Sequence, residues 1–109
     1  MANKEFLPKN NKNNDTATLY YFYTTWCPHC KTTTPHWESL KSETNGIVNN
    51  VNIIFREVDC DSDSTTADKF KIKEYPTFKL IHNNTIYNYD AKPEKDTLVK
   101  FLNSVIKPS

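Results

Sequence analysis

TTWCPHCK, residues 24–31, joins a continuously apolar run at 19–23 to a segment with helical character at 28–43. Cys27 and Cys30 are three residues apart at the start of that helix, so they lie on one face about one turn from each other. Their sulfurs are then close enough to form and break a disulfide. Partial positive charge and unpaired N–H groups at a helix N-terminus stabilise a thiolate. The stretch therefore predicts a redox centre.

The residues around the two cysteines support this prediction. The fixed φ of Pro28 suits a first helical turn, where its missing N–H is not needed. His29, when protonated, favours the thiolate form of a neighbouring cysteine. Further along the helix, we expect a kink at Pro35. We also expect a left-handed cap at Gly46, the single glycine of the chain.

The composition fits one compact domain. A chain of 109 residues with 37% hydrophobic content has enough apolar mass for a single core. The formal net charge of +1, spread along the chain, gives no electrostatic reason to expect a nucleic acid or an anionic membrane as partner. No apolar run approaches the roughly 20 residues that span a bilayer. We therefore expect a monomer that binds neither nucleic acid nor membrane.

The N-terminal region leads to an expectation about location. Residues 1–18 are polar and rich in Asn and Lys, without the apolar segment of a secretion signal. This absence predicts a cytoplasmic protein. The bias toward Asn and Lys also indicates an AT-rich genome. If the source is a large DNA virus, we expect the protein to be associated with the virion.

The order of apolar segments predicts alternating strands and helices. After a leader at 1–17, strands at 19–23 and 51–58 flank the helix at 28–43, which makes a right-handed βαβ unit with parallel strands. The later segments are a short helix that ends near Lys71, a strand at 75–81, a turn at Asn83-Asn84, a hairpin strand at 85–89 and a helix opened by Pro93.

The three cysteines do not make a disulfide scaffold, because Cys60 is left over beside the close pair. They favour catalytic or metal-binding thiols. A structural zinc site needs about four Cys or His ligands. Here the pair would have to recruit Cys60 and one of two histidines, His29 or His36, at no recognised spacing. The pattern favours redox chemistry, and a metal site stays open as an alternative.

Three features now stand together: Cys-Pro-His-Cys at a strand-to-helix junction, Tyr-Pro-Thr at 75–77, and the order of elements. In these features, residues 18–106 resemble the thioredoxin superfamily, and within it the protein disulfide isomerase branch. The Pro-His dipeptide between the cysteines is that of the DsbA group. The resemblance implies a thioredoxin fold, an α/β architecture with a central mixed four- or five-stranded sheet flanked by helices and trimmed at the N-terminus. The thioredoxin-like domain would span 18–109, after a flexible or loosely packed leader at 1–17.

The resemblance also implies roles for individual residues. Cys27 would be the exposed nucleophile and Cys30 the buried resolving thiol. Pro76 would follow a cis peptide bond and face the cysteines, while the backbone beside Tyr75 would pair with a bound peptide. Trp26 would flank the site and help to shape a shallow apolar groove for unfolded polypeptide.

The chain departs from the family pattern at several positions. Six residues before the nucleophile, where the family carries a buried acid that accepts the proton of the resolving thiol, stands Tyr21. A phenol with a pKa of about 10 is no base near neutral pH. Two loop glycines of the family appear here as Lys71 and Glu74. The Glu74 carboxylate would disfavour a thiolate at Cys27 or select basic substrates. Cys60 is either a third redox thiol or, as we expect, a small buried hydrophobe.

We therefore expect a thiol–disulfide oxidoreductase that acts on cysteine-containing proteins through the Cys27–Cys30 couple and oxidises or isomerises its substrates. It would need no cofactor beyond this redox-active disulfide, and an upstream thiol oxidase would reoxidise it. Two alternatives remain. One is a reductant of thioredoxin or glutaredoxin type, recycled by a reductase or by glutathione. The other is a non-enzymatic metal-binding or adaptor domain that uses the three cysteines, Cys60 included.

Overall fold

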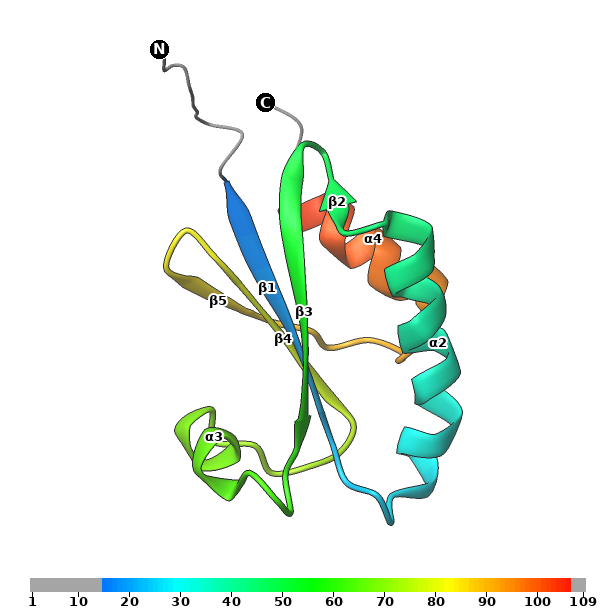
Figure 1. Cartoon of the computed structure of the whole chain (residues 1–109), viewed down its shortest axis with the longest axis vertical. Coiled ribbons are helices and arrows are strands. Elements are labelled where there is room, and N and C mark those ends of the chain that lie inside the picture. Colours follow the sequence, from blue (N-terminus) through cyan, green and yellow to red (C-terminus); the bar gives the residue numbers. More distant parts are fainter. Residues whose placement is uncertain (1–14, 107–109) are drawn as a thin grey trace.

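A computed structural model describes residues 15–106. The elements are β1 (Thr16–Tyr23), α2 (Pro28–Thr44), β2 (Ile47–Val48), β3 (Val51–Asp59), α3 (Ser64–Lys69), β4 (Thr77–His82), β5 (Thr85–Asn88) and α4 (Lys95–Val105). The strands form one sheet in the order β2-β3-β1-β4-β5 (Figure 1). β1 and β3 are parallel, and the other pairs are antiparallel. This mixed five-stranded sheet with flanking helices confirms the predicted fold class.

The two faces of the sheet are covered differently. α2 and α4 lie against one face, while α3 lies at one end of the other (Figure 1). Alternating residues of β1 follow this division, since side chains on a strand point to opposite faces in turn. Leu19 and Tyr21 enter the main core with Trp37 of α2 and Leu98 of α4, whereas Phe22 joins a smaller cluster beneath α3.

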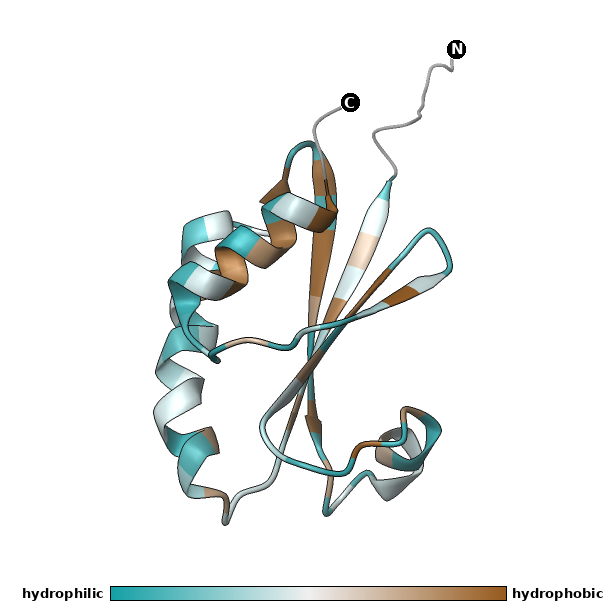
Figure 2. Cartoon of the chain, turned by 180° about the vertical axis from the view of Figure 1, so that it is seen from behind, coloured by the Kyte–Doolittle hydropathy of each residue, from teal (hydrophilic) through white to brown (hydrophobic). Residues whose placement is uncertain are grey.

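One apolar stripe holds α4 against the sheet. Leu98 and Leu102 are fully buried, and Val99, Phe101 and Val105 pack against the same core. This spacing repeats with the helical period, as predicted. In Figure 2 the brown, apolar segments lie in α4 and the central strands, while α2 is mostly teal and white.

Several boundaries differ from those expected. β1 begins at Thr16, so the strand takes in the last two residues of the expected leader; the rest of that leader, 1–14, lies outside the described residues. α4 begins at Lys95 instead of Pro93. Its start is fixed by α2, because the Lys95 N–H donates to Nδ1 of His36 at 3.2 Å and the Lys95 ammonium pairs with Glu43 at 2.8 Å.

The end of α2 also differs in detail. Asn45, not Gly46, is the left-handed C-cap, with a φ of 53° and its N–H donating to the carbonyl of Lys41 at 3.0 Å. Asparagine tolerates this conformation better than other side chains do. Gly46 follows with a φ of 76° and leads into β2, a short strand that the sequence did not predict. Pro35 lies inside α2, as expected.

Candidate active site

Cys27 occupies the N-cap of α2. Its backbone is extended, and its sulfur accepts a hydrogen bond from the Cys30 backbone N–H at 3.1 Å. An N-cap side chain normally accepts a hydrogen bond from one of the free amides of the first turn. Here the acceptor is the sulfur of Cys27. Pro28 stands at the first helical position, where its missing N–H costs nothing. The sulfur of Cys27 therefore faces the positive end of a helix of 17 residues.

Both cysteines of the pair are buried free thiols. Cys27 is 4% exposed and Cys30 is 2% exposed. The prediction of an exposed Cys27 is therefore wrong for this state of the protein. The reason is local: the N-cap position turns the sulfur inward, toward the first-turn amides, while the side chains of Pro28 and His29 stay exposed. The prediction of a buried Cys30 is confirmed.

Cys30 is the thiol of the pair whose pKa is raised by its surroundings. Burial raises the pKa of the Cys30 thiol to about 12, and its hydrogen bond with Cys27 adds to the rise, while the backbone N–H of Thr24 opposes it. The Cys27 sulfur, by contrast, accepts the Cys30 amide and lies at the positive end of the helix. The arrangement thus separates a nucleophile from a proton-carrying partner.

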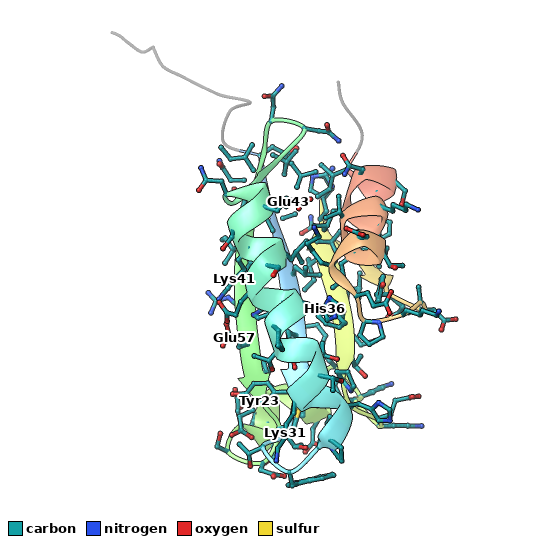
Figure 3. The ribbon with its side chains drawn as sticks, turned by 90° about the vertical axis from the view of Figure 1, so that its right-hand side faces the viewer. Tyr23, Lys31, His36, Lys41, Glu43 and Glu57 are labelled. Atoms are coloured by element: carbon teal, nitrogen blue, oxygen red, sulfur yellow. The ribbon has the colours of Figure 1, made fainter. Side chains whose placement is uncertain are left out.

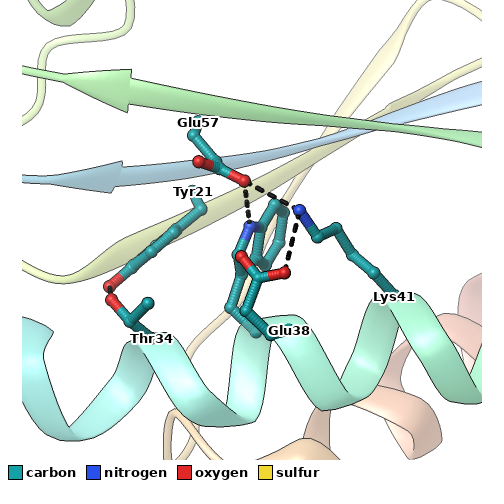
Figure 4. Close-up of polar contacts among 6 residues, drawn as sticks. Tyr21, Thr34, Glu38, Lys41 and Glu57 are labelled. Atoms are coloured by element: carbon teal, nitrogen blue, oxygen red, sulfur yellow. Dashed lines mark hydrogen bonds and ion pairs between the residues drawn. The ribbon is translucent and has the colours of Figure 1, made fainter.

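Tyr21 lies beneath the start of α2. Its hydroxyl donates to the Cys30 carbonyl at 3.1 Å and is 3.0 Å from the hydroxyl of Thr34 (Figure 4). Thr34 itself donates to the same carbonyl at 2.9 Å. Burial raises the pKa of Tyr21 to about 12. The phenol stays neutral, touches the backbone of Cys30, and supplies no base to the dithiol.

A groove opens beside the cysteine pair. The peptide bond between Tyr75 and Pro76 is cis, as predicted. His29, Glu74, Tyr75 and Pro76 share the lining of a groove of about 580 Å³ with the segment that follows β5. The helix start of α2 and the loop before β4 therefore meet at one surface. Glu74, exposed to solvent, is one of the residues of this surface, next to the site as the sequence suggested.

Trp26 forms one wall of the site. The indole is 62% exposed, and its Nε1–H donates to Asp61 at 2.8 Å. Its ring meets that of Tyr75 edge to face, with centroids 6.0 Å apart. Two loops, before α2 and after β3, are thus joined to the loop that carries the cis proline. Trp26 was expected to flank the site and to shape a groove there; it contacts Tyr75, but it is not among the residues that line the groove.

Cys60 belongs to the small core beneath α3. It is 6% exposed and packs with Phe22, Val58 and Ala67. Burial raises the pKa of its thiol, and nearby carboxylates, Asp59 first, raise it further. A buried thiol with a raised pKa is a poor nucleophile. The structure favours the buried hydrophobe over the third redox thiol.

The metal alternative finds no support in the described part of the chain. Within residues 15–106, no group of three or more His, Cys, Asp or Glu side chains is arranged to hold a metal ion. His36, one of the two histidines that such a site would have recruited, instead accepts the N–H at the start of α4.

Sequence reasoning missed two polar residues of the site and one that joins α2 to the sheet. Thr24 lies directly before the motif, is 1% exposed, and its hydroxyl has no partner among the described residues. Thr34 completes the network around the Cys30 carbonyl. Glu57 of β3 accepts hydrogen bonds from the indole of Trp37 and the ammonium of Lys41, each at 2.9 Å (Figure 4). No motif marks these residues, and the contacts of Thr34 with Tyr21 and of Glu57 with Trp37 depend on tertiary packing.

Comparisons with known proteins agree with this geometry. The family profile described as Thioredoxin matches residues 1–104. Protein disulfide-isomerase TMX3 of Homo sapiens is 35% identical over 97 residues, which cover 89% of this chain and 21% of that protein. Protein disulfide-isomerase A4 of Mus musculus is 31% identical over 90 residues, which cover 83% of this chain and 14% of that protein. The chain thus spans about a fifth or less of these two relatives.

A solved structure shows the same architecture. The first thioredoxin domain of mouse Protein disulfide-isomerase A4 superposes with a TM-score of 0.73 and 29% sequence identity, covering 85% of this chain and 65% of that one. The match extends the likeness from sequence motifs to the arrangement of sheet and helices.

These relatives also correct the expected location. The prediction of a cytoplasmic protein is wrong, because the homologous disulfide isomerases are proteins of the endoplasmic reticulum, which points away from the cytoplasm. The prediction rested on a missing signal in residues 1–18, and a chain that matches only a fraction of its relatives carries no information on that point. None of the helices in residues 15–106 has the length and apolar character to cross a bilayer.

Proposed function

Since the chain belongs to the thioredoxin family, and its homology to protein disulfide isomerases supports thiol–disulfide oxidoreductase activity, we propose that it oxidises or isomerises disulfides of protein substrates rather than reducing them. One observation carries this proposal: Cys27 caps α2 with its sulfur 3.1 Å from the Cys30 amide nitrogen. A thiolate there is stabilised by the helix N-terminus. A stabilised thiolate favours the reduced protein, and a favoured reduced form makes its disulfide a stronger oxidant.

Isomerisation uses the Cys27 thiolate. It attacks one sulfur of a substrate disulfide, forms a mixed disulfide, and releases the other substrate sulfur as a thiolate. That thiolate attacks a second substrate disulfide, and a later substrate thiolate displaces Cys27, so no electrons are gained or lost overall. The high pKa of Cys30, about 12, keeps the resolving thiol protonated. Because Cys30 then resolves the mixed disulfide slowly, the substrate has time to rearrange its disulfides.

Oxidation starts from the Cys27–Cys30 disulfide. A substrate thiolate attacks the sulfur of Cys27, and Cys30 leaves and takes up a proton. A second substrate thiolate then attacks the mixed disulfide, which forms the substrate disulfide and releases Cys27 as a thiolate. Two electrons pass from the substrate to the couple. Repeated turnover requires a thiol oxidase that accepts these electrons, and we include such a partner in the proposal.

The lining of the groove supports a polypeptide substrate. The cis-proline loop, His29 and Glu74 line this groove, and the exposed ring of Trp26 lies outside the lining, against Tyr75. An open groove of about 580 Å³ accepts an extended segment better than it encloses a small molecule. The carboxylate of Glu74 favours segments with basic side chains near the reacting disulfide.

The test is the reduction potential of the Cys27–Cys30 couple, equilibrated against glutathione. We expect a value between about −180 and −120 mV, the range of disulfide isomerase and DsbA. A value near the −270 mV of thioredoxin would replace the proposal with the reductant alternative. The Cys60→Ser variant is the matched control, because Cys60 is buried in a separate cluster and its loss should leave the potential unchanged.

Two variants separate the activities. Cys30→Ser keeps the nucleophile, so it should still isomerise a scrambled substrate while losing net oxidation. Cys27→Ser should lose both activities, since no other cysteine of the described chain lies at a helix N-cap. Refolding of reduced ribonuclease and reactivation of scrambled ribonuclease measure the two activities side by side. Equal loss in both assays for Cys30→Ser would contradict an isomerising role.

A further inference from the structure

Beyond the redox site, one face of the sheet is left uncovered by the described elements. On the side away from α2 and α4, alternate residues of four neighbouring strands stand in register. A first row across β3, β1, β4 and β5 is apolar apart from one threonine, and consists of Ile54, Thr18, Ile81 and Ile86. The next row consists of Arg56, Tyr20, Lys79 and Asn88. We call these two rows the open sheet face.

The open sheet face is accessible in the structure. Ile54 is 43% exposed and Ile86 is 53% exposed, which makes them two of the large hydrophobic residues left in contact with solvent. Among the described elements only α3 lies on this side of the sheet, and it covers the far end, next to Phe22 and Val58 (Figure 1). Between α3 and the two rows lies a hollow of about 780 Å³.

The hollow carries an excess of positive charge. Arg56 and Lys79 come from the sheet, and Lys69 and Lys71 from the end of α3 and the turn after it. Asp63 is the acidic residue of the lining whose side chain faces this side, where it caps α3. The backbone of Glu57 also borders the hollow, but its carboxylate binds Trp37 and Lys41 on the other face of the sheet.

We propose that the open sheet face binds an acidic amphipathic helix of a partner polypeptide. A sheet with a parallel pair at its centre is normally covered by helices on both faces. The apolar row crosses four strands, about 14 Å at ~4.8 Å a strand. A helix of about 10 residues spans that length at 1.5 Å a residue. Apolar side chains of such a helix would cover the isoleucines, and its carboxylates would pair with the cations of Arg56 and Lys79.

Net charge distinguishes an acidic partner from the N-terminal segment of the chain itself as the occupant of the open sheet face. Residues 1–14 contain Lys4, Lys9 and Lys12 against the single Glu5. Their net charge has the same sign as that of the open sheet face, so electrostatic complementarity favours a partner of opposite charge. A second copy of the chain would bring two positive faces together and is disfavoured for the same reason.

A synthetic helix tests the proposal. The probe is an N-acetylated, C-amidated peptide of about 14 residues with leucines at helical spacing and flanking glutamates. Titrated into labelled protein, it should shift the amide resonances of Thr18, Ile54, Ile81 and Ile86. Binding should weaken about tenfold in the double variant Arg56→Glu/Lys79→Glu and decrease with added salt. Lys100→Glu, which changes an exposed lysine of α4, is the matched control and should bind normally.

Ile86→Glu provides a second variant, because this half-exposed position at the sheet edge accepts a charge without unfolding the core. It should also abolish binding. The proposal fails if a peptide with lysines in place of the glutamates binds equally well, or if the shifts map to α2, α4 or the groove beside Pro76. It also fails if deletion of residues 1–14 produces the same shifts without peptide, or if the protein dimerises through the two rows. None of these readouts depends on Cys27.

Discussion

At the scale of single residues, the pair Cys27 and Cys30 divides one task between two sulfurs. Cys27 caps the helix, and Cys30 holds a proton whose pKa burial raises to about 12. Attack by Cys30 on a mixed disulfide requires its thiolate, and the rate depends on the thiolate fraction. Resolution of a mixed disulfide at Cys27 should therefore accelerate about tenfold for each pH unit between pH 7 and 10. Stopped-flow release of a chromophoric thiol from Cys27 measures this dependence.

Tyr21 supplies the control for that measurement. Its hydroxyl contacts the Cys30 carbonyl and Thr34, and its own pKa is raised to about 12, so it does not act as a base below pH 10. Tyr21→Phe should leave the pH profile unchanged and lower the free energy of unfolding by about 1 kcal/mol, the net value of one hydrogen bond. A plateau near pH 7 in the parent protein, lost in Tyr21→Phe, would reveal proton transfer through the phenol and contradict this account.

Lys71 is a second residue with a local conflict. Six non-glycine residues of the described chain have a positive φ; five are asparagines, and the sixth is Lys71 with a φ of 56°. The left-handed conformation costs an ordinary side chain about 1–2 kcal/mol, and Asn tolerates it better. Lys71→Gly should therefore raise the free energy of unfolding by about 1 kcal/mol, because glycine removes this strain but loses more entropy on folding.

The neighbouring Lys73 is the control for this substitution, since it is exposed and its φ is not positive. Lys73→Gly should lower the free energy of unfolding by a few tenths of a kcal/mol, through the added freedom of the unfolded chain. Urea unfolding of both variants compares the two positions. Equal destabilisation by the two glycines would show that Lys71 is not strained.

At the scale of elements, Glu57 joins β3 to α2. The fully buried Trp37 donates its indole N–H to this carboxylate, and Lys41 pairs with it at 2.9 Å; Figure 3 shows Lys41 and Glu57 at the same edge of the molecule. Glu57→Ala leaves the indole N–H without its acceptor, which should cost about 1–3 kcal/mol of stability. Glu38→Ala removes only an exposed ion pair with Lys41 and should cost less than about 0.5 kcal/mol.

The contacts of Glu57 should also make the free energy of unfolding depend on pH. The Trp37 and Lys41 contacts lower the pKa of Glu57 from its ordinary value of 4.5. Because the folded pKa is the lower one, this stabilisation is complete above the unfolded pKa and is lost as the pH falls through the folded value. As the pH falls, the parent protein should lose this stabilisation, whereas Glu57→Ala, which has no carboxylate at this position, has none to lose. Identical acid sensitivity of parent and variant would argue against the contribution.

The elements that sequence could predict are those with local causes. Pro28 and the N-capping Cys27 mark the start of α2, and Asn83-Asn84 takes the expected turn with both φ values positive. The start of α4 and the strand β2 have distant causes. His36 and Glu43 of α2 fix the first residue of α4. Nothing in the sequence near Pro93 indicates these two contacts. β2 is two residues long; it pairs with β3 and buries Val48 in the main core.

The features of the site also divide into those with local causes and those that depend on distant contacts. The cysteines and the cis proline could be predicted because short motifs encode them. The burial of Cys27 could not, since it depends on how the N-cap sulfur turns toward the first-turn amides. The roles of Thr34 and Glu57 were also hidden, because their partners lie 13 and 20 residues away in the chain. Only a folded sheet and helix bring these groups together.

At the scale of the whole molecule, the redox state of one pair should set the stability of the domain. A thiolate at Cys27 gains the Cys30 amide and the helix N-terminus only in the folded, reduced protein. By the thermodynamic cycle that links folding to reduction, a couple more oxidising in the folded chain than in the unfolded chain makes the reduced fold the more stable one. Each kcal/mol shifts the melting temperature of a domain of this size by about 4–8 °C.

We therefore expect the melting temperature to rise by several degrees when dithiothreitol reduces the Cys27–Cys30 disulfide. The double variant Cys27→Ser/Cys30→Ser, which cannot form this bond, should melt at the same temperature with and without reductant. Calorimetry of both proteins separates the effect of the couple from that of Cys60, which is present in both and is buried in the reduced structure. A higher melting temperature for the oxidised protein would reverse the sign of the cycle. The helix cap would then be too weak to favour the reduced form, and the chain would act as an electron donor.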